Sequence, residues 1–237
     1  MGVNESRNVV VTGANRGLGL EFTRQLLARG HRVVAGCRQP GHADALTQLA
    51  AAHPGHLHIA PLDVADQRSR DAFVHEVAAM HPALDLLINN AGTLPRGERF
   101  GALQPEVLEH ALRVNAVAPL LLAQALAPQL AKGRGPRVFN LSSRLGAMAL
   151  TETFQTPSYA ISKAALNMAT VLMARALNPL GIGVLAASPG WVRTEMGGDR
   201  APVTAQESVQ DMLDMLERRA GLPAGEFVDR DGSPLPW

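Results

Sequence analysis

The chain has 237 residues, of which 46% are hydrophobic, and this length and composition suit one large α/β domain with a well-filled core. We therefore expect a single domain over residues 1–237. The 22 basic and 21 acidic side chains leave a net charge of +1, and no basic cluster lies among aromatic residues, so nucleic acid is not an expected partner. The single cysteine, Cys37, excludes an internal disulfide.

The sequence also argues against export and against a membrane span. Residues Met1–Arg7 are polar, and the apolar run Val9–Val11 passes directly into Thr12 and Gly13, so we see no secretory signal and expect a cytoplasmic protein. The apolar stretch Val117–Ala131 is interrupted by two prolines and two glutamines, which favours a buried or interface helix. The eight histidines show no metal-ligand spacing, so no metal site is expected.

Short β-rich runs alternate with segments of helical periodicity along the chain. Strands are expected at Asn8–Thr12, Arg32–Cys37, Leu57–Leu62, Leu84–Asn89, Arg137–Leu141, Gly183–Ser188 and Glu226–Val228. Helices are expected at Leu18–Arg29, Ala43–Ala52, Gln67–Met80, Pro105–Ala131, Ser158–Asn178 and from a capping box at Thr204 to about Arg219. Strands apolar on both faces that alternate with helices predict an α/β fold: a Rossmann-type, doubly wound parallel sheet of about seven strands, with helices on both faces.

A glycine-rich turn joins the first expected strand to the first helix. Gly13, Gly17 and Gly19 would let the backbone approach a phosphate at the helix N-terminus, with Asn15, Arg16 and Leu18 between them. The spacing G-x-x-x-G-x-G differs from the commoner fingerprint G-x-G-x-x-G. The alternative is an ordinary glycine turn.

The second expected strand ends at Gly36-Cys37-Arg38, where many dinucleotide folds have an acid that binds the adenosine ribose. Arg38 and Arg16 suit a phosphorylated ribose instead, which predicts NADP(H) over NAD(H). Their alternative role is surface solvation. Asp63 and Val64 follow the third strand, where they would meet the adenine, although Asp63 would equally suit a helix cap.

Tyr159 is the only tyrosine in the chain, and Lys163, one of two lysines, lies four residues after it. On a helix these positions share a face, so the ammonium would favour the ionised phenol. Lowering the phenol pKa from about 10 to neutrality requires a shift of roughly 3 units, the order expected for two close charges. The alternative is a core tyrosine beside an unrelated lysine.

Several motifs follow one another in a fixed order: the glycine turn at 13–19, Asp63, Asn89-Asn90-Ala91-Gly92, Asn115, Ser142-Ser143, Tyr159 with Lys163, and Pro189 to Thr194. In this order the chain resembles the short-chain dehydrogenase/reductase family over essentially its whole length. The resemblance implies a catalytic tetrad of Asn115, Ser143, Tyr159 and Lys163, with Ser143 chosen over Ser142 by motif alignment. Beyond the residues already named, it implies cofactor contacts from Asn89, Ala91, Gly92, Tyr159, Lys163, Pro189, Gly190, Val192 and Thr194.

Three shorter features are similar to the branch of sniffer-like carbonyl reductases and C-factor: the run Ser-Ser-Arg-Leu-Gly, the run Ser-Lys-Ala-Ala-Leu-Asn-Met, and the sixteen positions from Ser143 to Tyr159. This resemblance implies NADPH-dependent reduction of an aldehyde or ketone, in which Tyr159 protonates the carbonyl oxygen. Ser143 would hold that oxygen and Lys163 the nicotinamide ribose. Asn115 would anchor a water in a proton relay.

Five apolar residues flank the expected catalytic loops: Leu94, Leu145, Met148, Trp191 and Met196. They predict a pocket for a lipophilic carbonyl substrate, although apolar residues at such positions are often core. Gly197 and Gly198 lie in a segment, near 195–220, that we expect to close over substrate as a lid. Family members associate through the long helices expected at Pro105–Ala131 and Ser158–Asn178, which implies a homodimer or homotetramer.

Three other functions fit the sequence less well. A C-factor-like signalling or regulatory protein that binds NAD(P) with little turnover is the main alternative, although the complete tetrad favours an enzyme. A serine hydrolase lacks support because Gly-x-Ser-x-Gly is absent and no histidine follows His110. A sugar epimerase of the extended type would need a larger carboxyl-terminal region.

Overall fold

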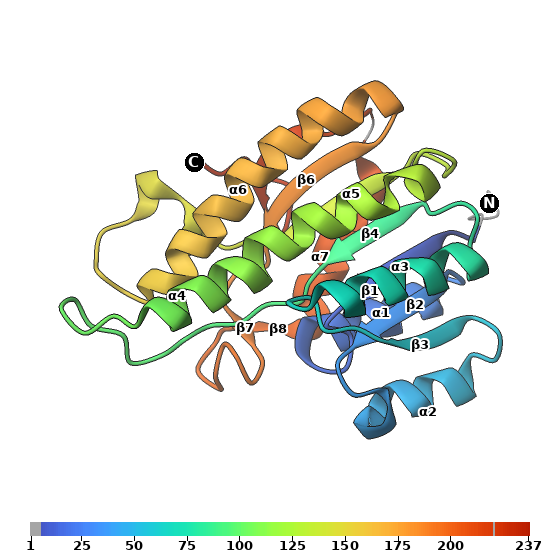
Figure 1. The fold of residues 1–237 in the computed structure, drawn as a ribbon, viewed down its shortest axis with the longest axis horizontal. Helices are drawn as coiled ribbons and strands as arrows, with labels where there is room; N and C mark the ends of the chain where they lie inside the picture. Colours follow the sequence, from blue (N-terminus) through green and yellow to red (C-terminus); the bar gives the residue numbers. More distant parts are fainter. Residues whose placement is uncertain (1–5, 220) are drawn as a thin grey trace.

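The computed structural model describes residues 6–219 and 221–237, and its centre is a parallel sheet of seven strands in the order β3-β2-β1-β4-β5-β6-β9 (Figure 1). The strands are β1 (Asn8–Thr12), β2 (Arg32–Cys37), β3 (Leu57–Pro61), β4 (Leu86–Asn89), β5 (Arg137–Leu141), β6 (Gly183–Ser188) and β9 (Ala224–Asp229). The order reverses direction between β1 and β4, as in doubly wound sheets. The predicted fold class is confirmed.

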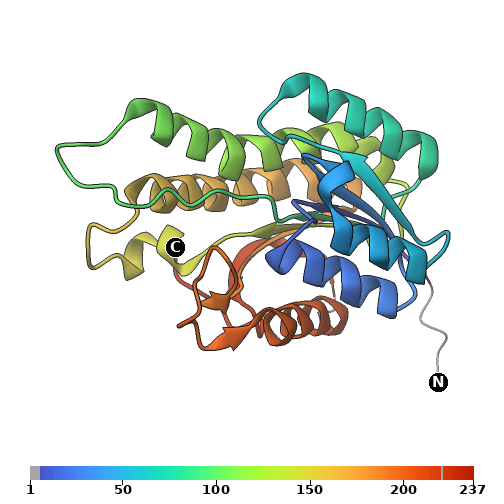
Figure 2. The ribbon, with the colours of Figure 1, turned by 90° about the horizontal axis from the view of Figure 1, so that it is seen from below.

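Helices cover both faces of the sheet (Figure 2). They are α1 (Gly17–Ala28), α2 (Asp44–Ala52), α3 (Gln67–Met80), α4 (Pro105–Leu112), α5 (Ala118–Leu130), α6 (Pro157–Leu177) and α7 (Ala205–Arg218). Successive side chains of a strand point to opposite faces, and β1 shows the result. Val9 and Val11 pack with α1, α2 and α7, whereas Val10 packs with α3, α5 and α6.

Most predicted boundaries agree with the structure to within one or two residues, but the predicted helix Pro105–Ala131 is not uniform. Five residues, Arg113–Val117, form a π-helical segment between α4 and α5, in which the amide of Ala118 donates to the carbonyl of Arg113. Such segments are rare in proteins, and those that occur are often located at functional sites. The short pair of strands β7 (Val192–Arg193) and β8 (Val203–Thr204) was also not predicted from the sequence.

One helical stretch, Pro105–Leu130, is long and apolar enough to cross a membrane by length and composition, with a mean hydropathy of 1.3. Half of its most apolar window is buried inside the protein. Leu122, Leu126 and Leu130 are fully buried in the core beneath the sheet. The core helix of a globular domain has this same composition.

Because the strands are parallel, their carboxyl ends meet at one edge of the sheet. The glycine turn follows β1, Asn90 to Gly92 follow β4, Ser142 and Ser143 follow β5, and the Pro189 loop follows β6. These four strands are neighbours in the sheet. The motifs that are separated in sequence therefore converge at one edge.

Candidate active site

The glycine turn between β1 and α1 fits a bound phosphate. Gly13 and Gly17 have φ angles of +63° and +53°, which residues with a side chain rarely adopt. A Cβ on Gly19 would lie 2.2 Å from the carbonyl oxygen of Gly13, so only glycine fits there. The first turn of α1 has no acidic residue and no side-chain cap from Arg16. Its unpaired N–H groups and helix dipole therefore suit an anion.

Asn90 holds this turn in place. Its side-chain amide donates to the carbonyls of Thr12 (2.8 Å) and Gly13 (3.1 Å), while the Thr12 hydroxyl accepts from the amide of Ala91 (3.0 Å). No role was predicted for Asn90, although it lies in the motif Asn89-Asn90-Ala91-Gly92. The predicted cofactor residue Asn89 is instead buried, and its side chain donates to Asn140 (2.9 Å). Any cofactor contact from Asn89 would have to come from its backbone.

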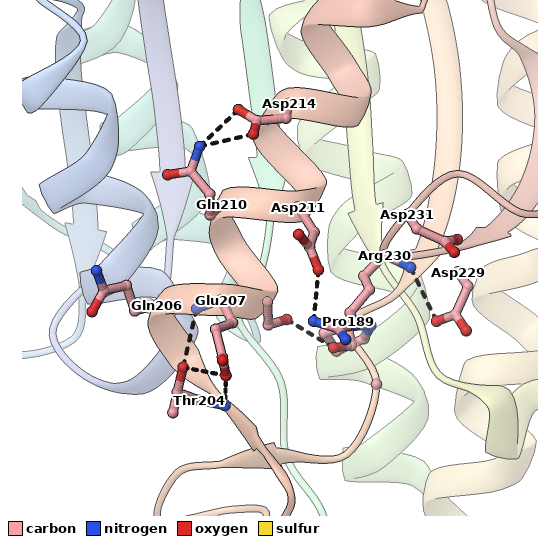
Figure 3. A network of polar contacts seen from close by, with 12 residues as sticks. Pro189, Thr204, Gln206, Glu207, Gln210, Asp211, Asp214, Asp229, Arg230 and Asp231 are labelled. Atoms are coloured by element: carbon pink, nitrogen blue, oxygen red, sulfur yellow. Dashed lines mark hydrogen bonds and ion pairs between the residues drawn. The ribbon is translucent and has the colours of Figure 1, made fainter.

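Helix α7 and the chain after β9 brace the loop that follows β6 (Figure 3). The Ser208 hydroxyl donates to the carbonyl of Pro189 (2.7 Å), and Arg230, paired with Asp211 (2.6 Å), lies beside Gly190. The predicted capping box at the start of α7 is confirmed, since Thr204 and Glu207 bond each other's backbone amides.

Farther along the same loop, Thr194 faces the glycine turn. Its methyl group lies 3.7 Å from where a Cβ on Gly17 would be. Val192, by contrast, has a buried side chain. The loop that follows β6 and the glycine turn that follows β1 therefore line the same part of the sheet edge at the carboxyl ends of the strands.

The two arginines expected at a ribose phosphate are both exposed. Arg38 follows the end of β2, and Arg16 lies at the N-terminus of α1, where it forms an ion pair with Glu195. A phosphate at Arg16 would have to share or replace the Glu195 carboxylate.

Asp63 and Val64 have different local roles. A carboxylate oxygen of Asp63 accepts from the amide of Ala65 (2.9 Å), whereas the cap of α3 is Asp66, which accepts from Ser69 (2.7 Å). The helix-cap alternative for Asp63 is thus wrong. Val64 is buried in the core, so its side chain is not presented at the edge.

Tyr159, Lys163 and Ser143 come together where β5 and α6 meet. The Lys163 ammonium lies 5.5 Å from the centre of the Tyr159 ring and donates to the carbonyl of Leu141 (2.6 Å). The Ser143 hydroxyl lies close enough to the Tyr159 phenol to lower its pKa. Both Tyr159 and Lys163 are buried, which argues for the i,i+4 pairing predicted from the sequence and against an exposed lysine.

Burial controls the protonation of this pair. It raises the pKa of the Tyr159 phenol to about 12, against a smaller lowering by the hydrogen bond with Ser143. Burial also lowers the pKa of Lys163 to about 8. The expectation that Lys163 brings the phenol pKa down toward neutrality is therefore wrong for the protein without ligands, because burial strongly disfavours the charged phenolate. At neutral pH the phenol is protonated and the lysine is mainly charged.

The adjacent serines are distinguished by their surroundings. Ser142 is buried and donates to the side-chain oxygen of Asn167 (2.6 Å), whereas Ser143 is partly exposed beside Tyr159. Asn167 also donates to the carbonyl of Gly146 (3.2 Å) and so ties the segment after β5 to α6. This geometry agrees with the choice of Ser143.

Asn115 lies in the π-helical segment and joins two parts of the site. Its side-chain amide donates to the carbonyl of Thr93 (2.9 Å) and to the hydroxyl of Ser162 (2.9 Å), and its oxygen accepts from the amide of Thr93 (2.9 Å). Both side-chain donors are thus occupied within the protein. The water-anchoring role remains a prediction.

Comparison with known families decides the classification. The family model described as short chain dehydrogenase matches residues 7–204. The chain belongs to the short-chain dehydrogenase family. Among curated relatives of this short-chain dehydrogenase, the protein named C-signal from Myxococcus xanthus is 36% identical over 154 residues, covering 65% of this chain and 93% of the relative.

Solved structures of other short-chain dehydrogenases have the same fold. The carbonyl reductase Sniffer of D. melanogaster is 32% identical with a TM-score of 0.93, and the NADPH-bound carbonyl reductase from chicken fatty liver is 36% identical with a TM-score of 0.91. Each comparison covers 98% of this chain and 100% of the other. The resemblance to the sniffer-like and C-factor branch is therefore confirmed.

In this short-chain dehydrogenase, the apolar residues expected near substrate lie mostly at the surface. Leu145, Met148, Trp191 and Met196 are exposed, and Leu94 is partly exposed, so the core alternative is wrong for them. The Trp191 indole donates to the carbonyl of Gly197 (2.8 Å), and Arg96 donates to that of Met196 (2.6 Å). Within residues 6–219 and 221–237, no group of three or more His, Cys, Asp or Glu side chains is placed to hold a metal.

Proposed function

We propose that this short-chain dehydrogenase reduces a lipophilic aldehyde or ketone to an alcohol with NADPH, and that Tyr159 is the general acid. The observation that carries the proposal is a buried, protonated phenol that lies beside Ser143 and Lys163. A reductase must donate a proton to the oxygen that becomes the alcohol, so a protonated phenol is in the state that the reaction needs.

Each residue has a distinct part in the proposed reaction. When bound, NADPH supplies the hydride that reduces the carbonyl carbon. Ser143 donates a hydrogen bond to the carbonyl oxygen, where negative charge develops, and Tyr159 transfers its proton to that oxygen. The Lys163 ammonium stabilises the resulting phenolate and binds the nicotinamide ribose. Hydride and proton together convert the carbonyl to an alcohol.

We assign the preference for NADPH over NADH to residues that follow β1 and β2. The chicken fatty liver relative is an NADPH-bound enzyme. Here the exposed Arg38 follows β2, where an acid would select NAD(H), and the exposed Arg16 lies at the N-terminus of α1. Around them, the glycine turn at Gly13–Gly19, with Asn15 and Leu18, holds the diphosphate. The remaining contacts are assigned to Asp63, Val64, Asn89, Ala91, Gly92, Pro189, Gly190, Val192 and Thr194.

The substrate side is apolar. Met148, Trp191 and Met196 are exposed on the segments that follow Ser143 and Gly190, which favours a lipophilic substrate. Residues 195–202 form the lid in this proposal. The predicted range up to 220 is too long, because α7 packs Val209, Met212 and other residues into the core.

A panel of aldehydes and ketones of increasing chain length tests the proposal, with consumption of NADPH and of NADH followed in parallel. We expect turnover with NADPH, a preference for longer apolar substrates and a lower KM for NADPH than for NADH. Arg16→Ala and Arg38→Ala should raise the KM for NADPH while leaving that for NADH nearly unchanged. A lower KM for NADH than for NADPH would contradict the assignment of these arginines.

The likeness to C-signal favours one second candidate, a regulatory protein that binds NADP(H) with little turnover. Binding of NADPH without oxidation by any carbonyl in the panel would support it.

A further inference from the structure

The helix that carries Tyr159 and Lys163 lacks a cap of its own. Thr156, the residue before α6, has left-handed backbone angles (φ +40°, ψ +55°), and it is the one described residue other than glycine with a positive φ. Its side chain makes no capping hydrogen bond, and its buried hydroxyl oxygen has no partner among the described residues. A β-branched residue in this conformation is strained, so the helix start must be held by other contacts.

Glu98 supplies those contacts from a loop sixty residues earlier in the chain. One carboxylate oxygen of Glu98 accepts from the backbone amide of Ser158 (3.3 Å), and the other accepts from the Ser158 hydroxyl. Ser158 is only 2% exposed, and Glu98 is partly buried. A carboxylate at a helix N-terminus satisfies an unpaired N–H group and interacts favourably with the helix dipole.

The loop that carries Glu98 is fixed at several points. Thr93, five residues before Glu98, is bonded through its backbone to Asn115, and the Phe100 ring packs edge-on against that of Phe154 with 5.5 Å between centres. Figure 1 shows the Phe100 and Phe154 segments projecting from the same end of the molecule. Glu98 is thus held from both sides rather than placed on a free loop.

Ser158 directly precedes Tyr159, so any loosening of the first turn of α6 moves the phenol. We propose that Glu98 is a positioning residue, which caps α6 in place of Thr156 and thereby holds Tyr159 in its catalytic geometry. The inference rests on the proposed function for its kinetic consequence, but the structural claim is separate from it. Displacements of about 1 Å cost large factors in rate, so loss of the cap should affect turnover more than cofactor binding.

The single tyrosine provides a readout that needs no activity. Phenolate absorbance in an alkaline titration reports Tyr159 alone, because the chain has no other tyrosine. The groups close to the phenol are Ser143 and Lys163 in every variant. In the wild-type protein only about a tenth of the phenol should be ionised at pH 11, since its pKa is about 12. If the first turn frays, the phenol becomes exposed and its pKa falls toward about 10.

Three variants of Glu98 separate position from charge. Glu98→Gln keeps an oxygen acceptor for the Ser158 amide, Glu98→Asp keeps the charge but shortens the reach, and Glu98→Ala removes both. Glu109→Ala, at an exposed acid on α4, is the matched control. We expect Glu98→Ala and Glu98→Asp to lose about tenfold or more in kcat with little change in the NADPH Kd. Glu98→Gln should stay near the wild-type kcat, and Glu109→Ala should match the wild type.

The titration should follow the same order, with ionisation of Tyr159 at lower pH in the Ala and Asp variants and a wild-type curve for Gln. If Glu98→Ala does not fold, the titration curves and kcat values of Glu98→Asp and Glu98→Gln test the proposal. The inference would be overturned if both Glu98→Ala and Glu98→Asp had the titration curve and the kcat of the wild type, even with a lowered Tm. Where Glu98→Ala does not fold, the same result for Glu98→Asp would overturn it. If the wild-type protein reduces no carbonyl, the proposed function fails, while the titration still tests the role of Glu98.

Discussion

At the scale of single residues, the central feature is a phenol that is harder to ionise than free tyrosine. The i,i+4 spacing predicts that attraction to Lys163 lowers the pKa of Tyr159. Burial acts in the opposite direction, and it is the largest influence on the pKa of each of the two side chains. The sequence shows the pair but not the depth of the pocket, which depends on how β5, α6 and their loops pack.

The buried Lys163 should make stability depend on pH in a defined window. Its pKa is about 8 in the folded protein and 10.5 ordinarily, so between these values the unfolded chain binds a proton that the folded chain has lost. The free energy of unfolding therefore rises with pH in this window, by about 1.4 kcal/mol per unit. The penalty for burying the charge is complete below about pH 8 and is relieved toward 10.5.

Chemical denaturation of the wild-type protein and Lys163→Met between pH 8.5 and 10 measures this effect, because the variant lacks the titrating group. The difference in unfolding free energy between the two should grow with that slope in favour of the wild type. This range ends at about pH 10, the ordinary pKa of tyrosine, above which the raised pKa of Tyr159 makes stability fall as the pH rises. A difference that stays constant would show that Lys163 has an ordinary pKa.

The two adjacent serines provide a matched pair. Ser143→Ala removes the hydroxyl beside Tyr159 and should lower kcat by about 100-fold with little loss of stability. Ser142→Ala leaves the oxygen of Asn167 without its donor, so it should lower the free energy of unfolding by about 1–3 kcal/mol and affect kcat less. Steady-state kinetics and thermal unfolding distinguish the two, and the reverse pattern would assign the catalytic role to Ser142.

At the scale of elements, the glycine turn makes a specific prediction. Gly19→Ala would place a Cβ 2.2 Å from the Gly13 oxygen and 2.5 Å from the Asn90 amide nitrogen, so the turn must open. We expect at least about a tenfold weaker Kd for NADPH, because the backbone amides no longer converge on the phosphate. Gly41→Ala, where a Cβ would have no neighbour within 4 Å, is the control. Cofactor titration by fluorescence measures both, and an unchanged Kd for Gly19→Ala would contradict the phosphate role.

Regular elements were predicted well because their patterns are local. Strands β1, β2, β5 and β6 have the predicted bounds, since each is a short, mainly apolar run with turn-forming or polar residues directly after it. The π-helical segment at Arg113–Val117 was not predictable, because its residues suit an ordinary helix and the extra residue is held by contacts of Asn115 with Thr93 and Ser162. Helix α7 was placed in the lid, whereas its apolar face, with Val209, Met212 and Leu213, packs into the core against the sheet.

In the candidate site, too, the features with a local sequence pattern were predicted and those that depend on long-range contacts were not. Motif residues such as Gly13, Ser143 and Tyr159 were found from the sequence because their spacing carries the signal. The residues that hold them were missed: Asn90, Ser162, Asn167 and Glu98 act on partners between three and 78 positions away. Such pairings depend on which strand ends and helices become neighbours in space, and one sequence does not display them.

At the scale of the whole molecule, the outer faces of α5 and α6 predict self-association. Five large apolar side chains are exposed in and just before these helices: Val117, Leu120, Ile161, Met168 and Leu172. Exposed apolar groups on neighbouring helices are typical of an interface, and we expect a homodimer or homotetramer. Met168→Glu combined with Leu172→Glu should shift the sedimentation coefficient toward the monomer. A wild-type protein that is monomeric at micromolar concentration would contradict this expectation.

The proposed reaction depends on Tyr159 as the proton donor. The most direct test compares NADPH-dependent carbonyl reduction by the wild-type protein and by Tyr159→Phe. Phenylalanine keeps the buried ring and removes only the hydroxyl. The variant should bind NADPH with a nearly unchanged Kd and lose about 100-fold or more in kcat, the usual contribution of a general acid. Turnover by Tyr159→Phe at the wild-type rate would contradict the account.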